Sequence, residues 1–568
     1  MSLQPRPWPD VPEQTARMAR AAFRKGNLAT RIRDELGQVY EDARFSAAFG
    51  VRGRPGISPA QLMTASVLQF SENLTDRQAA DAVRDRITWK YALGLELDDP
   101  GFDPTVLSEF RDRLVAGDLT SLALDALLQR LAGLGLVKAR GRQRTDSTHI
   151  LGAIRDLNRL ELAGETLRAA LEALAAAAPH WLTSVIDDSW TGVYGTRVDN
   201  LRLPESRTRR DELMVRYGID GYHLLDAAHH PDAPQWLAQI PAVQTLRLIW
   251  IQQFYRDTDN TGQEVRRREH APDGDGVPPG RDRVISPYDL DARYSIKRDT
   301  GWGGYKVHFT ETRDPPTGTT GRETGRGEHP NLITNVATTT ATVPDPAMTA
   351  IIHQRLADKA LTPAEHLVDS GYPSAEIIVT AARRHGITLI SPMLIDPSAQ
   401  ARAGQGYDKA AFTFDFDTRH GVCPQGNTST SWSPCRQRDT DTIVVSWPKT
   451  VCQPCPTRQE CTRGTRRQIT IHPRDLHEAL TAARIQQNTS EWKARYAARA
   501  GIKGTMRQST HVTGTRTARH RGLPKTRLEH TLAATPINII RLDSYWTGRP
   551  LDRTRTTHLQ RLDFTLAA

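Results

Sequence analysis

The chain has 568 residues, 38% of them hydrophobic and 25% charged, and its 75 Lys and Arg against 65 Asp and Glu give a net charge of +10. Such a length allows two to four domains, and the composition is that of a globular chain. No apolar run reaches about 18 residues, and the first residues lack the apolar segment of a signal peptide, so we expect a cytoplasmic protein without membrane spans. The basic excess fits a nucleic-acid partner but does not establish one.

Residues 1–135 are predicted to form a helical domain. Ser58 followed by Pro59 is typical of a helix start, and Thr75 with Gln78 predicts a capping box for a helix from Asp76 to about Trp89. This helix carries Arg77, Arg84 and Arg86, and Lys90 lies just beyond it; on the next helix, Arg111 and Arg113 are expected to face outward. Short capped helices with outward Arg predict a helix-turn-helix-like DNA-binding unit, and a plain helical bundle is the alternative.

The segment Arg144–His149 reads RTDSTH and is predicted as part of a strand to Ile150. Its Asp146 would, on its own, be an ordinary turn or cap residue. Helix-forming residues dominate 153–178, and further helices reach about Tyr255, which predicts a helical insertion at about 153–255. Within it, 243–251 could be strand instead of helix, and the Gly- and Pro-rich residues that follow, 257–286, are predicted to be a loop.

A strand–helix–strand unit is predicted from Leu367 to Ser391. Its first strand ends at Asp369, and its helix is capped by Ser374 and stopped by Gly386. Asp369 therefore lies at the carboxyl end of a strand, the usual place for a site in an α/β sheet. Before this unit we expect strands at 301–310 and 332–336, a polar loop at 313–328 and a helix at 347–360.

The last third begins with a β-rich, Cys-containing insertion at about 411–472 that holds all five cysteines. A long helix is predicted from Asp475 to beyond Arg499. A second helix, from Lys525 to about Leu542, should be interrupted at Pro536 because an interior proline removes a backbone donor. Residues 546–568 are predicted to be a polar tail.

Three stretches carry the strongest functional signal. They are RTDSTH around Asp146, the segment HLVDSGY around Asp369, and the segment from Tyr496 to Thr505, in which Tyr496, Arg499 and Lys503 are spaced by three and four. This trio resembles the catalytic signatures of DDE transposases of bacterial insertion sequences, and more narrowly the eleven-eighty-two family, over most of the chain. That family carries its third acid, a Glu, where this sequence has Lys503.

The resemblance implies an α/β fold with an RNase H-like core in a catalytic domain spanning 136–545. It implies that Asp146 and Asp369 hold Mg²⁺ (or Mn²⁺), because hard carboxylate oxygens suit these ions. Water would attack a phosphodiester at the element's end, and the freed 3′-hydroxyl would attack target DNA. The implied partners are double-stranded DNA, at terminal inverted repeats and target, and a second copy in a synaptic homodimer associated with the nucleoid.

Residues around the third motif are predicted to contact DNA. Arg499 would bind a phosphate, and Tyr496 would position a terminal nucleotide or else pack in the core. Residues 501–541 hold eight Lys or Arg and one acid, Glu529. The DNA-binding candidates among them are Arg507, Arg516, Arg519, Arg521 and Lys525.

The cysteines suggest a second metal site. Cys452 and Cys455 are separated by two residues, Cys461 follows six residues later, and Cys423 lies upstream, which makes a structural Zn²⁺ site plausible. Cys435 is a fifth candidate, and a cytosolic chain disfavours disulfides. In the same segment, Trp432 and Trp447 could stack on a flipped base, although packing is the commoner role.

Lys503 decides between two functions. A lysine has no lone pair while protonated, so it would repel Mg²⁺ and could instead pair with Asp146 or Asp369. Glu491 lies over three helical turns away and cannot replace the missing acid, whereas Glu529 stays open. The sequence therefore predicts a transposase, and the alternative is a catalytically impaired copy that acts only as a DNA-binding protein.

Overall fold

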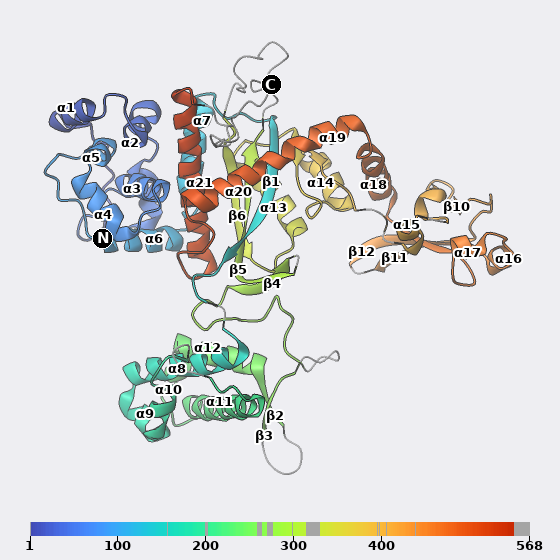
Figure 1. Ribbon diagram of the computed structural model, residues 1–568, viewed down its shortest axis with the longest axis horizontal. Helices are drawn as coiled ribbons and strands as arrows, with labels where there is room; N and C mark the ends of the chain where they lie inside the picture. The colour runs from blue at the N-terminus through green and yellow to red at the C-terminus, as the bar shows by residue number, and fades with distance from the viewer. Residues whose placement is uncertain are drawn as a thin grey trace, which may run out of the picture.

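The computed structural model describes residues 2–155, 157–198, 203–257, 264–269, 276–297, 299–313, 330–394, 396, 398–404, 406–437 and 439–549. Four parts are visible in Figure 1: N-terminal helices, a central sheet with its covering helices, a helical lobe, and a small β-rich module. Nearly all of the polar loop predicted at 313–328 and most of the tail predicted at 546–568 lie outside the described residues.

The central sheet is mixed, with β4, β5, β1, β7 and β8 in this order and β6 also paired to β5. Strand β5 runs antiparallel to β1, β4 and β6, whereas β7 is parallel to both β1 and β8. The strands are β1 (Arg142–Leu151), β4 (Arg293–Lys297), β5 (Thr300–Thr312), β6 (Ile333–Thr340), β7 (Glu365–Leu367) and β8 (Thr388–Ile390). The α/β class predicted from the sequence is confirmed.

Strand β5 pairs with three other strands of this sheet, and its residues are buried along almost its whole length. Its pairing changes from β4 to β6 near Gly304, which has a φ of +144°. A Cβ atom at this position would lie 2.4 Å from the carbonyl oxygen of Ile150 on β1. Glycine is therefore required where the two strands approach each other.

Two helices that contact each other pack on the sheet, one against β6 and the other against β8. They are α13 (Asp345–Asp358) and α14 (Ala375–His385). The side chain of Ser374 caps α14, and Gly386 ends it in the left-handed conformation, as the sequence predicts.

A long helix, α21 (Leu523–Trp546), lies between the sheet and the N-terminal helices (Figure 1). The interruption predicted at Pro536 is wrong, because α21 runs through this residue. Pro536 and its neighbours are buried, and Asn538 fixes the helix to β6 through two hydrogen bonds with the backbone of Ile333. Tertiary packing here outweighs the local effect of proline.

The N-terminal helices share one hydrophobic core with the sheet and α21. They are α1 (Glu13–Ala22), α2 (Leu28–Arg31), the turns η1 (Ile32–Leu36) and η2 (Asp42–Ala48), α3 (Pro59–Ser71), α4 (Asp76–Asp85), α5 (Ile87–Leu93), α6 (Thr105–Ala116) and α7 (Leu122–Gly133). The predicted capping of α3 and α4 is confirmed. The boundary at 135 stays a prediction.

Two details of this helical region correct the sequence analysis. The helix predicted from Asp76 to Trp89 breaks at Arg86, which is extended, so that α5 starts a new axis. Arg111 was expected to face outward, but it is buried, and Lys90 is buried as well. Lys90 donates to the carbonyl groups of Glu96 and Asp99, and Arg111 pairs with Asp76. These two cations hold the domain together instead of facing a ligand.

The helical lobe has a hydrophobic core of its own. It contains α8 (Arg159–Ala177), α9 (Pro179–Val185), α10 (Ser189–Tyr194), α11 (Arg207–Ala228), η4 (Leu237–Gln239) and α12 (Pro241–Gln253). Residues 243–251 are thus helical. A short hairpin of β2 (Phe254–Asp257) and β3 (Glu264–Arg267) replaces part of the loop predicted at 257–286, because β3 packs against α11.

The β-rich module contains a two-stranded and a three-stranded sheet. Its strands are β9 (Thr413–Asp415), β10 (His420–Val422), β11 (Ser431–Gln437), β12 (Thr440–Ser446) and β13 (Gln468–Ile471). Its short helices are α15 (Ala399–Ala403), η5 (Lys409–Ala411), α16 (Lys449–Cys452) and α17 (Arg458–Cys461). Trp447 is buried in its core and Trp432 packs against that core, so the packing interpretation of both residues is confirmed.

The long helix predicted after Asp475 is divided into four pieces. They are α18 (Arg474–Gln486), α19 (Ser490–Ala497), the 3₁₀ turn η6 (Ala498–Gly501) and α20 (Ile502–Val512). Thr489 caps α19 and so begins a new helix. Among all described helices, none has the length and apolar character needed to cross a membrane.

Candidate active site

Asp146 and Asp369 come together where β7 separates from β1. The parallel pairing of these strands covers only Arg142 to Arg144 of β1, and the next residues of the β7 segment lead into a turn at Asp369. Each carboxylate accepts a hydrogen bond of 2.9 Å from the backbone N–H of the following residue. The two predicted acids therefore lie together beyond the point where the pairing of β1 with β7 ends.

Arg499 bridges the two carboxylates. Its Nη2 atom lies 3.0 Å from Oδ2 of Asp146 and 3.2 Å from Oδ2 of Asp369. The Arg499 side chain is 8% exposed, whereas the Asp369 side chain is 46% exposed. Burial raises the pKa of Asp146, and the charge of Arg499 opposes this effect only in part. One buried arginine thus serves two carboxylates, one of which faces solvent.

Tyr496 lies beside this arginine. Its ring stacks on Trp492 with the centroids 4.9 Å apart, and the Arg499 guanidinium lies 6.0 Å from its centroid. Tyr496 is only partly buried, so its ring packs locally while part of it faces outward. The predicted roles in contacting phosphate and a terminal nucleotide stay predictions.

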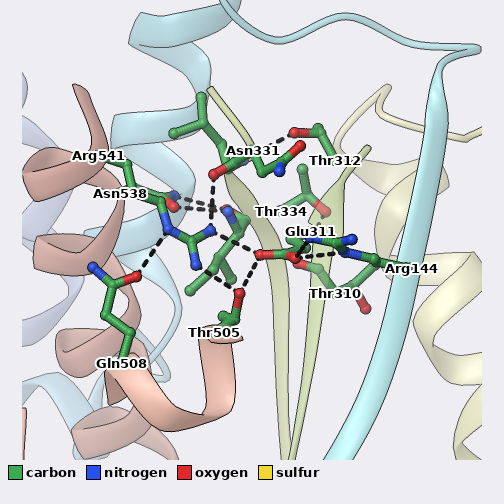
Figure 2. A network of polar contacts seen from close by, with 12 residues as sticks. Arg144, Thr310, Glu311, Thr312, Asn331, Thr334, Thr505, Gln508, Asn538 and Arg541 are labelled. Carbon is green, nitrogen blue, oxygen red and sulfur yellow. Dashed lines mark hydrogen bonds and ion pairs between the residues drawn. The ribbon is translucent and has the colours of Figure 1, made fainter. Parts of the chain in front are cut away.

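Glu311 on β5 positions the helical segment that carries Arg499 (Figure 2). Its side chain is fully buried and its carboxylate pairs with Arg144 of β1 at 2.6 Å and with Arg541 of α21 at 2.8 Å. Arg144 also donates to the carbonyl oxygen of Ala498 in η6 at 2.6 Å, and Thr505 of α20 donates its hydroxyl to Glu311. These bonds join the sheet to both ends of the segment 498–505.

Burial would raise the pKa of Glu311, but Arg541 and Arg144 outweigh it, so the pKa is lowered and the group is charged. The backbone of the segment 498–505 also lies very close to Arg144. A Cβ atom on Gly501 would lie 2.3 Å from Nη1 of Arg144. Sequence reasoning did not identify Glu311 or Arg541, because neither stands in a motif. Gly501, two residues after Arg499, was the signal in the sequence that pointed to close packing at this place.

Lys503 lies on the surface at the start of α20. The spacing of Tyr496, Arg499 and Lys503 by three and four predicted one shared face of a continuous α-helix. The 3₁₀ turn η6 interrupts that helix between α19 and α20, and Arg499 is buried whereas Lys503 is exposed. Within the described residues, Lys503 forms no ion pair with Asp146 or Asp369. Arg499 takes that position instead.

A third carboxylate, Asp345, stands near the pair and was not predicted. Ser147, next to Asp146, donates to Asp345 at 3.3 Å, and Lys306 of β5 pairs with Asp345 at 2.9 Å. Lys306 therefore compensates this charge. The described residues contain no group of three or more His, Cys, Asp or Glu side chains already arranged to hold a metal.

The predicted DNA-binding cations fall into two groups. Arg507, Arg516 and Arg521 are exposed. Arg519 instead donates to Asn73 and to the carbonyl oxygen of Leu74, and Lys525 pairs with Asp112. The second group thus connects the C-terminal segment to the N-terminal helices.

Glu529, which sequence reasoning left open as a substitute acid, is buried within α21. Its carboxylate accepts a hydrogen bond from the backbone N–H of Arg519 at 2.9 Å. Burial raises its pKa to about 7. No contact between Glu529 and the Asp146–Asp369 pair occurs in the described part of the chain, so it does not supply a third ligand there.

The four cysteines proposed as zinc ligands line one cavity. This cavity of about 30 Å³ is bordered by Cys423, Cys452, Cys455 and Cys461. Burial raises the pKa of the Cys461 thiol, and the three neighbouring cysteines raise it further. Cys435 lies on β11, where it contacts Thr442.

Two family matches cover opposite ends of the chain. Residues 18–113 match a transposase domain (DUF772), and residues 422–543 match a transposase DDE domain. No curated protein and no solved structure matches the chain. The second match includes position 503 and the four cysteines that border the cavity, whereas Asp146 and Asp369 lie outside both. The two matches together support a transposase of the DDE type.

Proposed function

We propose that the chain descends from a transposase that cuts DNA at the terminal inverted repeats of an insertion sequence and joins the freed ends to target DNA. The observation that carries this proposal is the convergence of Asp146, Asp369 and Arg499. These residues come from three separate stretches that resemble the DDE signatures, and they meet around one buried guanidinium. DDE transposases are polynucleotidyl transferases, which fits a site of paired carboxylates.

The sheet supports an RNase H-like core. In the order β6, β5, β1, β7 and β8, strand β5 runs antiparallel to both of its neighbours, and β1, β7 and β8 run parallel to one another. Asp146 is on the central member of this order and Asp369 follows its parallel neighbour. The helical lobe follows β1, and the β-rich module precedes the third motif, as in the predicted insertions.

The Asp146–Asp369 pair fits Mg²⁺ or Mn²⁺ in part. Two hard carboxylate oxygens already converge on one cationic nitrogen, and Asp369 is accessible to solvent. Bound Mg²⁺ would supply Lewis-acid activation of the phosphodiester and its attacking hydroxyl. The chain itself would orient the DNA, with Arg499 and the exposed Arg507, Arg516 and Arg521 available to phosphate oxygens.

Lys503 favours the alternative, a catalytically impaired copy that acts only as a DNA-binding protein. At this position the family has its Glu, whereas Lys503 adds a positive charge and no oxygen ligand. Neither Glu529 nor the compensated Asp345 replaces the missing acid. We infer that the fold and DNA contacts persist while strand cleavage is strongly reduced.

The test uses the purified full-length chain and DNA fragments that carry the ends flanking its gene. The protein should bind these ends and cleave them weakly in Mg²⁺, and Lys503→Glu should raise cleavage by orders of magnitude. Adding Asp146→Asn to Lys503→Glu should abolish the gain without reducing binding. Efficient cleavage by the unaltered chain, lost in Asp146→Ala, would overturn the inference about Lys503. Failure to prefer the ends over unrelated DNA would overturn the transposase proposal.

A further inference from the structure

The β-rich module has very little hydrophobic core to hold it together. Its buried apolar residues are Phe412, Val445, Trp447, Ile469 and Ile471. Three of the cysteines, Cys423, Cys452 and Cys461, pack against this cluster. Small units with so few core residues usually need a metal or disulfides for stability. The cysteines are all free thiols, so the structure holds them unpaired beside the core that needs support.

The backbone presents these thiols on tight turns. In the turn Cys423–Gly426, the Gly426 N–H donates to the Cys423 carbonyl oxygen at 2.8 Å, and Gly426 adopts a φ of +77°. The Cys423 N–H donates to Asn427 at 2.9 Å, and Asn427 accepts from the Trp447 indole. The core tryptophan thereby holds the first thiol in position.

The other three thiols come from the segment after Trp447. Cys452 ends α16, the Cys455 N–H donates back to the Cys452 carbonyl oxygen at 3.4 Å, and Cys461 ends α17. The Cys461 carbonyl oxygen accepts from Arg467 at 2.7 Å and from Gln400 at 2.9 Å. Two short turns therefore bring three cysteines to the cavity that Cys423 also borders.

We propose that Cys423, Cys452, Cys455 and Cys461 bind one structural Zn²⁺ in this cavity and that the ion stabilises the β-rich module. Four thiolates match the tetrahedral Cys₄ sites of zinc, which have Zn–S distances of about 2.3 Å. The thiols are not yet arranged around a metal, so they close on the ion by rotation about their Cα–Cβ bonds. Each bound thiol releases its proton to solvent, which leaves the site with a formal charge of −2.

Arg467 lies beside this site and can balance part of that charge. Its guanidinium stacks over the Phe412 ring at 5.4 Å, and its Nε has no hydrogen-bond partner among the described residues. A guanidinium held near the sulfur atoms stabilises thiolates. Arg467 is thus a positioning residue, because it fixes the Cys461 backbone and is placed to compensate the metal–thiolate cluster.

The chain contains its own control cysteine. Cys435 lies on β11 with its sulfur 3.3 Å from the Thr442 hydroxyl, and it does not border the cavity. Cys435→Ser removes a thiol from the same module without touching the proposed site. Cys455→Ser removes a ligand and keeps the size of the side chain.

The experiment measures metal content in the untagged full-length chain, expressed with added zinc and iron and purified without chelators. We expect about one zinc per chain in the unaltered protein and in Cys435→Ser, and less than about one fifth of that in Cys455→Ser. Limited proteolysis should then cut Cys455→Ser within the β-rich module much faster than Cys435→Ser. If Cys455→Ser proves insoluble, Co²⁺ exchanged into the unaltered protein should give the intense absorption of a tetrahedral thiolate site.

Several results would overturn the proposal. Stoichiometric iron in place of zinc would reject the identity of the ion. A disulfide among the four cysteines, seen as a mass loss of two hydrogens in the intact protein, would reject the metal site. Metal-free protein with protease resistance equal to that of a zinc-loaded sample would reject the stabilising role. None of these readouts depends on DNA cleavage, so the zinc proposal stands or falls independently of the proposed function.

Discussion

Two groups of carboxylates form ion pairs with arginine side chains in this sheet, one around Glu311 on β5 and one around Asp146 on the neighbouring strand β1. Glu311 is fully buried and binds two arginines, Arg144 and Arg541, together with a threonine hydroxyl. Asp146 and Asp369, by contrast, share the single Arg499, and Asp369 is 46% exposed. The first cluster holds more positive than negative charge, whereas the second keeps a net negative charge beside solvent.

This difference separates a structural from a functional use of the same residue types. A buried carboxylate with its oxygens satisfied connects elements, and its removal leaves unpaired cations. A carboxylate pair with one counter-ion and an open side attracts another cation. The pKa directions agree with this division, since Glu311 is shifted downward and Asp146 upward.

The largest expected effect is loss of stability in Glu311→Gln. The change leaves Arg144 and Arg541 without their counter-charge in the core, and breaking such a buried pair costs about 3–5 kcal/mol. Urea unfolding followed by circular dichroism would measure the free energy of unfolding. Because the pKa of Glu311 is lowered from 4.5, its contribution is present above that value and disappears as the pH falls. A loss below about 1 kcal/mol at pH 7 would show that the cluster does not hold the core.

A second buried glutamate should behave in the opposite way. The pKa of Glu529 is raised by burial to about 7, so its protonated form stabilises the fold below about pH 4.5 and this contribution is lost as the pH rises toward 7. Glu529→Gln should therefore increase the free energy of unfolding by up to about 3 kcal/mol at pH 8 and hardly at pH 5. Thermal unfolding at the two pH values checks this. An equal increase in the free energy of unfolding at pH 5 and pH 8 would show that Glu529 does not differ from Glu311 in this way.

Asp369→Asn tests the other half of the comparison, namely whether the Asp146–Asp369 pair contributes little to stability. The side chain is 46% exposed and shares its arginine with Asp146, so we expect a change in unfolding free energy below about 1 kcal/mol. The same urea experiment serves as the measurement. A loss as large as that of Glu311→Gln would mean that the pair is itself a structural cluster.

The smallest expected effect concerns DNA affinity. Arg507 is exposed, so Arg507→Gln should weaken binding about equally for different sequences and lower the salt dependence by about one released ion, with stability unchanged. Arg519→Gln is the matched control, because Arg519 bonds to Asn73 and Leu74 and its loss should reduce stability first. Anisotropy titrations at several salt concentrations distinguish the two. If Arg507→Gln reduced stability and Arg519→Gln reduced only DNA affinity, Arg519 would be the DNA-binding residue and Arg507 the structural one.

Much of the local structure could be predicted from the sequence. The caps at Ser58, Thr75 and Ser374 and the stop at Gly386 were recognisable because each depends on one side chain or one glycine. The continuity of α21 through Pro536 was not predictable, since it depends on packing between elements far apart in the chain.

The candidate site was predictable only in part. Asp146 and Asp369 stand in recognisable motifs and indeed lie together. The burial of Arg499, the exposure of Lys503 and the 3₁₀ turn η6 that begins just before Arg499 are not revealed by residue spacing. Glu311 escaped notice because an isolated acid in a strand becomes meaningful only when its distant partners are known.

The most direct test of the central claim is Mn²⁺ binding measured by electron paramagnetic resonance, which detects the free ion. The Asp146–Asp369 pair should bind Mn²⁺ weakly in the unaltered chain, somewhat better in Lys503→Gln, which only removes charge, and much more tightly in Lys503→Glu, which adds an oxygen ligand. Asp146→Asn should cancel the gain in Lys503→Glu. Equal affinity in all three proteins, or a gain that survives Asp146→Asn, would contradict the claim that this pair and residue 503 form one metal site.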